Sequence, residues 1–168
     1  MSIAASMLPE LDIELKNTRK VLERLPDESF GWKPHARSMS LLHLSSHVVN
    51  MLAWGTMTVQ TDSFDVAPVG QEPMKSPEHS GRAAALEAFD RNAAEFRSAL
   101  AAVEDGEMMQ TWSLLAGGEV IFAMPRVAAL RSMILNHLIH HRAQLTVYLR
   151  LLDKPVPALY GPSADENF

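Results

Sequence analysis

Cysteine is absent from this sequence of 168 residues, which excludes disulfide bonds, thiolate nucleophiles and zinc sites built on cysteine. No apolar run approaches the length of a bilayer span. Basic residues are outnumbered, 15 against 20 acidic ones, and the net charge of −5 argues against nucleic acid or an anionic membrane as the main partner. Residues 1–12 include Glu10 and Asp12 but no basic residue, so we expect no signal peptide and a cytoplasmic location.

Apolar residues recur at helical spacing in four stretches of the chain. The length and the hydrophobic content of 47% are typical of a soluble protein with a buried core. We therefore expect a single domain over residues 1–168, with an all-α fold arranged as a four-helix bundle. The first expected helix runs approximately over Ser6–Leu25, and the second from a cap at Ser38 or Ser40 to Val59. The third follows the Ser76-Pro77-Glu78 start signal and ends near Val103, and the fourth runs from after Pro125 to about Leu152.

The expected helices are joined by connections longer than the roughly two to eight residues that bundles usually need. One small hairpin is compatible with the third connection, pairing Thr111–Leu115 with Val120–Ala123 around a Gly-Gly turn. After Leu152, repeated prolines prevent residues 153–168 from continuing the helix. The apolar residues of this segment predict an extended C-terminal arm packed on the bundle.

Two histidines of the last helix fall on its apolar face. At about 100° per residue, His141 lies about 40° from His137, and the apolar positions of the helix span the same side. Arg142 projects to the outer face, and His140 to the margin. The pair fits two interpretations. The rings are either core histidines hydrogen-bonded to Ser, Asn or water, or two ligands at i and i+4 that converge on one metal ion.

A metal site needs a third ligand, and the second helix offers one. His47 lies about 60° from Leu44 and borders the buried stripe of that helix, whereas His43 is turned further toward the edge, near Trp54. His35 and His79 fall in loops. We therefore expect His47 to join the histidine pair of the last helix.

Three histidines suit Zn²⁺ or Ni²⁺ and leave at least one coordination position for water or substrate. Second ring nitrogens of metal ligands usually find a partner that orients the imidazole. The candidates for this role are Gln144, Asn136 and Asn50.

Two segments carry a resemblance to a known family. The run His-Leu-Ile-His-His-Arg-Ala-Gln that begins at His137, followed by the YGPSADE tail, resembles the C-terminal signature of the DinB family, the DinB/YfiT-like superfamily of metal-binding four-helix bundles. Residues 37–54 resemble that family's second helix. The resemblance implies that His47, His137 and His141 bind a divalent metal ion.

The family resemblance implies several functions. Its members are described mostly as uncharacterised or damage-inducible proteins or as metal-dependent hydrolases, and some relatives are transferases or isomerases that use low-molecular-weight thiols such as bacillithiol or mycothiol. We expect a metal-dependent enzyme acting on a small molecule, of transferase or hydrolase type. A thiolate would have to come from a cosubstrate, because the chain has no cysteine.

No residue stands out as a general base. Asp165 and Glu166 of the tail and Glu119 of the long connection are candidates, although each is expected as a solvated surface carboxylate. Because a metal-bound thiolate needs little help from a base, transfer is favoured over hydrolysis.

Two alternatives to an enzyme stay open. One is a non-enzymatic metal-binding or stress-related protein whose ion braces two helices, which a fourth protein ligand would indicate. The other is a metal-free interaction module, which requires His47 to lie away from the pair. Leu42 and Val49, opposite the buried stripe of their helix, suggest a homodimer.

Overall fold

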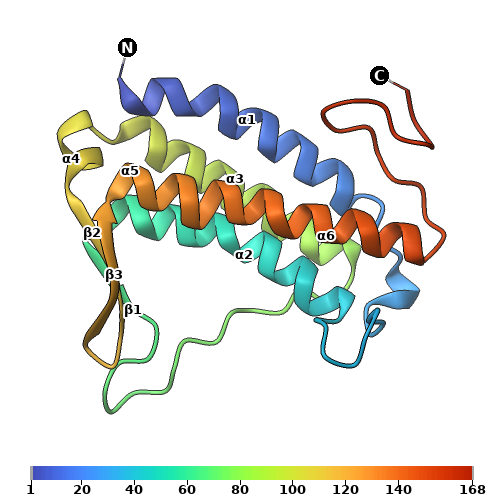
Figure 1. Cartoon of the computed structure of the whole chain (residues 1–168), viewed down its shortest axis with the longest axis horizontal. Coiled ribbons are helices and arrows are strands. Elements are labelled where there is room, and N and C mark those ends of the chain that lie inside the picture. The colour runs from blue at the N-terminus through green and yellow to red at the C-terminus, as the bar shows by residue number, and fades with distance from the viewer. Residues whose placement is uncertain (1, 168) are drawn as a thin grey trace.

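Four long helical segments lie side by side along the long axis of the molecule (Figure 1). The computed structural model describes residues 2–167. The elements are α1 (Ile3–Leu22), a 3₁₀ turn (Asp27–Ser29), α2 (Leu41–Gln60), β1 (Ser63–Asp65), α3 (Arg82–Ala102), α4 (Asp105–Met109), β2 (Thr111–Ala116), β3 (Glu119–Pro125), α5 (Arg126–Ala129), a π-helical segment (Leu130–Asn136) and α6 (His137–Leu151). The last three elements are continuous and form the fourth long segment.

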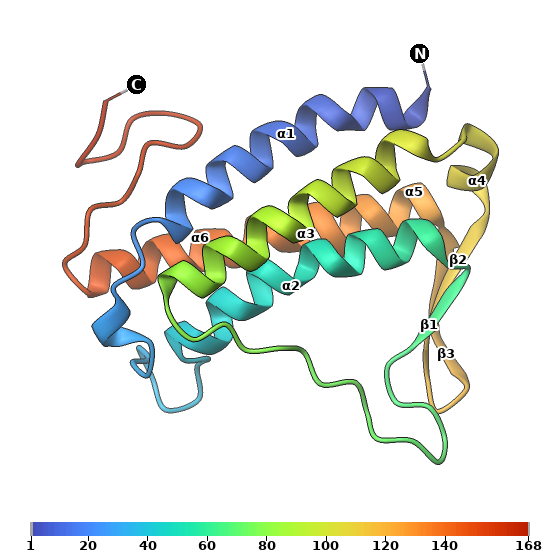
Figure 2. The same cartoon turned by 180° about the vertical axis from the view of Figure 1, so that it is seen from behind.

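Helices α2 and α3 run in the same direction, opposite to α1 and to the α5–α6 segment (Figures 1 and 2). Each of α1 and α2 packs against both α3 and α6. Because α2 ends at the far side from where α3 begins, residues 66–81 must travel back along the helices. This explains one of the long connections that the sequence indicated.

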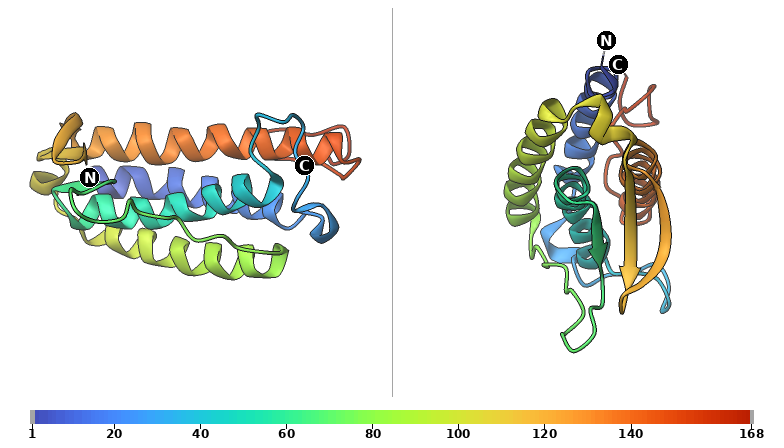
Figure 3. Two further views of the ribbon diagram at one scale, coloured as in Figure 1. Left: turned by 90° about the horizontal axis from the view of Figure 1, so that it is seen from below. Right: turned by 90° about the vertical axis from the view of Figure 1, so that its left-hand side faces the viewer.

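A three-stranded sheet in the order β1-β2-β3 lies at one end of the helices (Figure 3). The β2–β3 hairpin turns at Gly117 and Gly118, whose φ angles of 63° and 83° suit the two central residues of a type I′ turn. Strand β1 pairs in parallel with β2, and the Asp65 carboxylate accepts hydrogen bonds from both turn N–H groups at 3.1 and 2.7 Å. The mostly helical fold is thus confirmed, and the all-α expectation is corrected by the sheet.

The prediction that Arg142 lies on the outer face of the last helix is wrong. Only 1% of this residue is exposed, and its guanidinium lies 2.6 Å from the carboxylate of Glu14 on α1. Tyr160 of the C-terminal arm hydrogen-bonds to Arg142 and donates to Glu14 at 2.7 Å. Helix α1 and the arm therefore cover a side of α6 that the helical projection left open.

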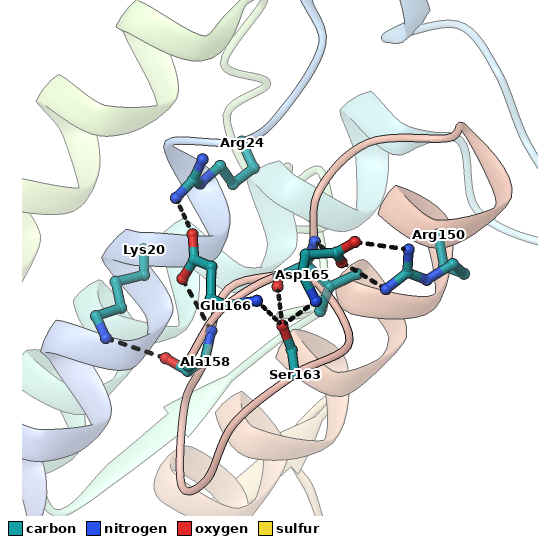
Figure 4. A network of polar contacts seen from close by, with 8 residues as sticks. Lys20, Arg24, Arg150, Ala158, Ser163, Asp165 and Glu166 are labelled. Atoms are coloured by element: carbon teal, nitrogen blue, oxygen red, sulfur yellow. Dashed lines mark hydrogen bonds and ion pairs between the residues drawn. The ribbon is translucent and has the colours of Figure 1, made fainter. Parts of the chain in front are cut away.

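The C-terminal arm is attached by its two acidic residues (Figure 4). Asp165 accepts from Arg150 at 2.6 Å and from the Val156 N–H at 2.9 Å. Glu166 pairs with Arg24 and accepts from the Ala158 N–H at 3.1 Å. Both carboxylates are occupied in holding the arm, which does not fit the suggestion that they serve as a general base.

Two further sequence expectations concern partners. Val49, one of the residues that suggested a homodimer, is fully buried, and its carbonyl accepts a hydrogen bond from Asn92 of α3. Its apolar character is therefore explained by packing within the chain. Among residues 2–167, no helix combines the length and apolarity that a membrane span requires.

The buried ion pair predicts a large effect of one substitution. Because Arg142→Met leaves the Glu14 carboxylate buried without its partner, we expect the free energy of unfolding to fall by about 3–5 kcal/mol. Arg97→Met is the matched control, since its pair with Asp12 is exposed by 49% and 45% and such pairs contribute about 0–1 kcal/mol. Urea denaturation measures the free energy of unfolding of both variants. Equal losses would contradict the conclusion that the buried pair of Arg142 and Glu14 matters more than the exposed one.

Candidate metal centre

Helix α2 carries His47. Its first turn is capped by Ser40, whose hydroxyl accepts from the His43 N–H at 3.2 Å. The buried residues Leu44, Val48 and Met51 then fix the face that the helix turns to the core. His47 lies on the edge of this face and is partly buried.

A π-helical segment, Leu130–Asn136, directly precedes the two histidines of the last helix. π-helical turns are rare and occur frequently at functional sites. His137 is the first residue of α6, and His141 follows one turn later on the same side. The π-helical segment thus ends at the residue before the first candidate ligand of this helix.

The structure brings the three predicted histidines together. Nε2 of His137 lies 3.5 Å from Nε2 of His47 and 2.8 Å from Nε2 of His141. The centroids of the three rings are 4.6 to 5.1 Å apart. In the described part of the chain these residues form a group of the size that a single metal ion needs, with no further His, Asp or Glu in it.

The hydrogen bonds of the Nδ1 atoms determine whether the Nε2 atoms of the same rings carry a proton. Nδ1 of His137 faces the Met133 carbonyl at 3.3 Å, and Nδ1 of His141 faces the side-chain oxygen of Gln144 at 2.7 Å. The Gln144 amide nitrogen donates to Nε2 of His140 at 3.1 Å. Since both oxygens only accept, each Nδ1 carries the proton. Each Nε2 then holds a lone pair, and the two lone pairs face each other at 2.8 Å.

A divalent cation fits this donor set. Two facing lone pairs repel unless a cation lies between them, and neutral imidazoles are good ligands for zinc and other late divalent ions. With metal–nitrogen bonds of about 2.0–2.1 Å, tetrahedral ligands lie about 3.4 Å apart and ligands at right angles about 2.9 Å apart. The separations of 3.5 and 2.8 Å are close to these two values.

All three rings are held in the neutral form that a metal ion requires. Burial, followed by the neighbouring rings of His141 and His137, lowers the pKa of His47 to about 4. Burial is also the main cause that lowers the pKa of His137 and of His141, with the Met133 carbonyl and Gln144 acting in the opposite direction. Proton competition for the ring nitrogens is therefore weak near neutral pH.

The remaining histidines lie outside the cluster. His43 is exposed, and its ring pairs with Glu78 at 2.8 Å. His79 is held by Asn50, with its Nε2 2.9 Å from the amide oxygen. His35 is exposed and accepts from a backbone N–H two residues later.

Of the three residues proposed to orient the ligands, Gln144 does so for His141. Asn50 bonds instead to His79 and to the Pro77 carbonyl. Asn136 is exposed, beside an open hollow next to His137 and His141.

Two cavities meet at His47, and sequence reasoning missed both. One is an apolar pocket of about 80 Å³ between α2, the sheet and the π-helical segment. The other is an open groove of about 590 Å³, lined by polar residues that include His43, Asn50, Lys75 and Glu78. The apolar residues of the hairpin were the sequence signal for the apolar pocket. Their contact with α2 could not be predicted, because it depends on where the sheet packs against the helices.

Comparison with known proteins identifies the family of this chain. The sequence model of the DinB family matches residues 1–167. This chain belongs to the DinB family. It is 28% identical over 159 residues to an uncharacterized protein of Bacillus subtilis (strain 168), YrdA, covering 95% of this chain and 89% of that protein.

A solved structure shows the same fold. The crystal structure of a DinB-like protein from Bacillus cereus ATCC 10987 superimposes with a TM-score of 0.69 and 23% identity, covering 95% of this chain and 98% of that one. The family membership predicted from the histidine run and the tail is confirmed.

The depressed pKa of His47 predicts a pH effect on the metal-free DinB protein. Below its ordinary pKa of about 6.5 this histidine takes up a proton in the unfolded chain, whereas in the folded chain it stays neutral down to about pH 4. Proton uptake by the unfolded state means that stability falls as the pH drops through this window. We expect the melting temperature to decrease between pH 7 and pH 5, above the range in which most carboxylates titrate.

His47→Gln removes the titrating ring, so the decrease between pH 7 and pH 5 should become smaller. His43→Gln is the matched control, because it changes an exposed histidine of the same helix. An unchanged slope in His47→Gln would show that burial of this ring does not depress its pKa. Differential scanning calorimetry after chelation measures all three proteins.

Proposed function

We propose that this DinB-family protein is a metal-dependent enzyme in which His47, His137 and His141 hold one divalent ion, zinc or nickel. The observation that carries the proposal is the convergence of three Nε2 atoms whose neighbours fix two of the rings as neutral donors. A bound ion would lower the pKa of a coordinated water or thiol and polarise a substrate oxygen.

An open coordination position supports catalysis rather than bracing. A structural ion is usually enclosed by four protein ligands, whereas a catalytic ion keeps a position for water or substrate. Within residues 2–167 the cluster consists of three histidines. His47 also lines both the apolar pocket and the polar groove, so small molecules can approach the cluster from two sides.

The surroundings of the cluster favour transfer of a low-molecular-weight thiol over hydrolysis. Among the described residues that line the three cavities at the cluster, Glu78 is the one carboxylate, and it is paired with His43. The earlier candidates Asp165 and Glu166 hold the C-terminal arm, and Glu119 is exposed at the hairpin turn. A coordinated thiolate is a nucleophile without further proton removal. Thiol transfer therefore depends less on a general base than hydrolysis does.

Metal analysis of protein purified without a histidine tag tests the site. We expect about one zinc or nickel ion per chain in the wild type and a loss of at least tenfold in affinity for His137→Ala, because one of three ligands is removed. His43→Ala is the matched control: its ring is exposed and directed to Glu78, so the metal content should not change.

Full metal content in His137→Ala would contradict the assignment of the site. A thiol-conjugation screen with small electrophiles then tests the reaction, and we expect transfer in the metal-loaded wild type and loss of transfer after chelation. Metal binding without an exchangeable position, measured by water relaxation on the Co²⁺-loaded protein, would favour a bracing ion instead.

A further inference from the structure

The apolar pocket beside the histidine cluster is formed by elements far apart in the sequence. Met51 and Trp54 come from α2, Trp112 and Leu114 from β2, Phe122 from β3. Met133 and Ile134 of the π-helical segment close it next to His137. The small sheet at the end of the helices therefore serves as a wall of this pocket.

Apart from the imidazoles, the described side chains that line the pocket offer a ligand no free hydrogen-bond donor. Thr58 lines it, but its hydroxyl donates to the Trp54 carbonyl at 2.8 Å. The indole N–H of Trp112 points to Thr61 at 3.4 Å. A polar group placed here would lose its hydrogen bonds to water without replacement, which costs free energy. The occupant that this lining accepts is an apolar group.

The size of the pocket restricts the occupant further. Its volume is about 80 Å³, about half of the ~150 Å³ apolar cavity that holds benzene in another protein. A straight chain of about three or four carbon atoms fits this space. Because His47 and His137 line one side, the chain would begin at the cluster and extend toward the sheet.

We infer that the pocket binds the short alkyl chain of a ligand whose polar end coordinates the ion. The inference rests on the proposed metal site and names the substrate class for it: small molecules with a metal-binding head, such as a thiol, next to three or four methylene or methyl carbons. The polar groove on the other side of His47 remains accessible to a second, water-soluble reactant.

A series of straight-chain thiols tests the inference on Co²⁺-loaded protein. The absorption spectrum of Co²⁺ first shows whether the ion binds to imidazoles, and a thiolate-to-Co²⁺ charge-transfer band then reports thiol binding at the ion. From ethanethiol to butanethiol we expect the affinity to rise about three- to fourfold for each added methylene. Hexanethiol should gain nothing further, because its end exceeds the pocket.

A pocket variant distinguishes this site from general hydrophobic attraction. Phe122→Ala enlarges the pocket, so hexanethiol should bind better than butanethiol. Val120→Ala is the matched control on the same strand, because this residue is 57% exposed and lies outside the pocket, and it should keep the wild-type order. Leu114→Ala serves as a second enlarging variant if Phe122→Ala does not fold.

The outcomes separate the two proposals. If Co²⁺ does not bind, the metal site is wrong. If Co²⁺ binds and coordinates thiols with affinities that do not depend on chain length, the metal site stands and the alkyl pocket is overturned. A dependence on thiol length that neither enlarging variant changes would also overturn the alkyl pocket, because the alkyl chain would then bind elsewhere.

Discussion

The candidate site depends on one electrostatic constraint: the Nε2 lone pairs of His137 and His141, one turn apart on α6, face each other at 2.8 Å. The Nδ1 bonds of His137 to the Met133 carbonyl and of His141 to Gln144 leave both Nε2 atoms unprotonated. Burial keeps the rings neutral, so protonation does not relieve the repulsion near neutral pH. A divalent cation relieves it, and the separations suit one.

The rest of the fold holds these rings in place. The Arg142 guanidinium, next in sequence to His141, is locked between Glu14 of α1 and Tyr160 of the arm, so α6 has little freedom to rotate. On the other side, the sheet and the π-helical segment close an apolar pocket against His137. Rigid support and a dry pocket are the conditions under which a bound ion acts strongly on a substrate.

Much of this was accessible from the sequence. Apolar spacing predicted the long helices, and helical projection together with the family resemblance selected His47, His137 and His141. The sequence did not predict β1, because three residues carry no periodicity, nor the burial of Arg142, because its partners Glu14 and Tyr160 lie more than a hundred residues apart. The pocket was missed for the same reason: its walls meet through tertiary packing, which local patterns do not encode.

The most direct test is an anomalous-scattering map from crystals of the protein loaded with one equivalent of zinc. The account predicts a single peak at about 2.0–2.2 Å from Nε2 of all three histidines, with the Nδ1 contacts to Met133 and Gln144 preserved. A peak bound by other residues, or one from which the His47 ring is turned away, would contradict it.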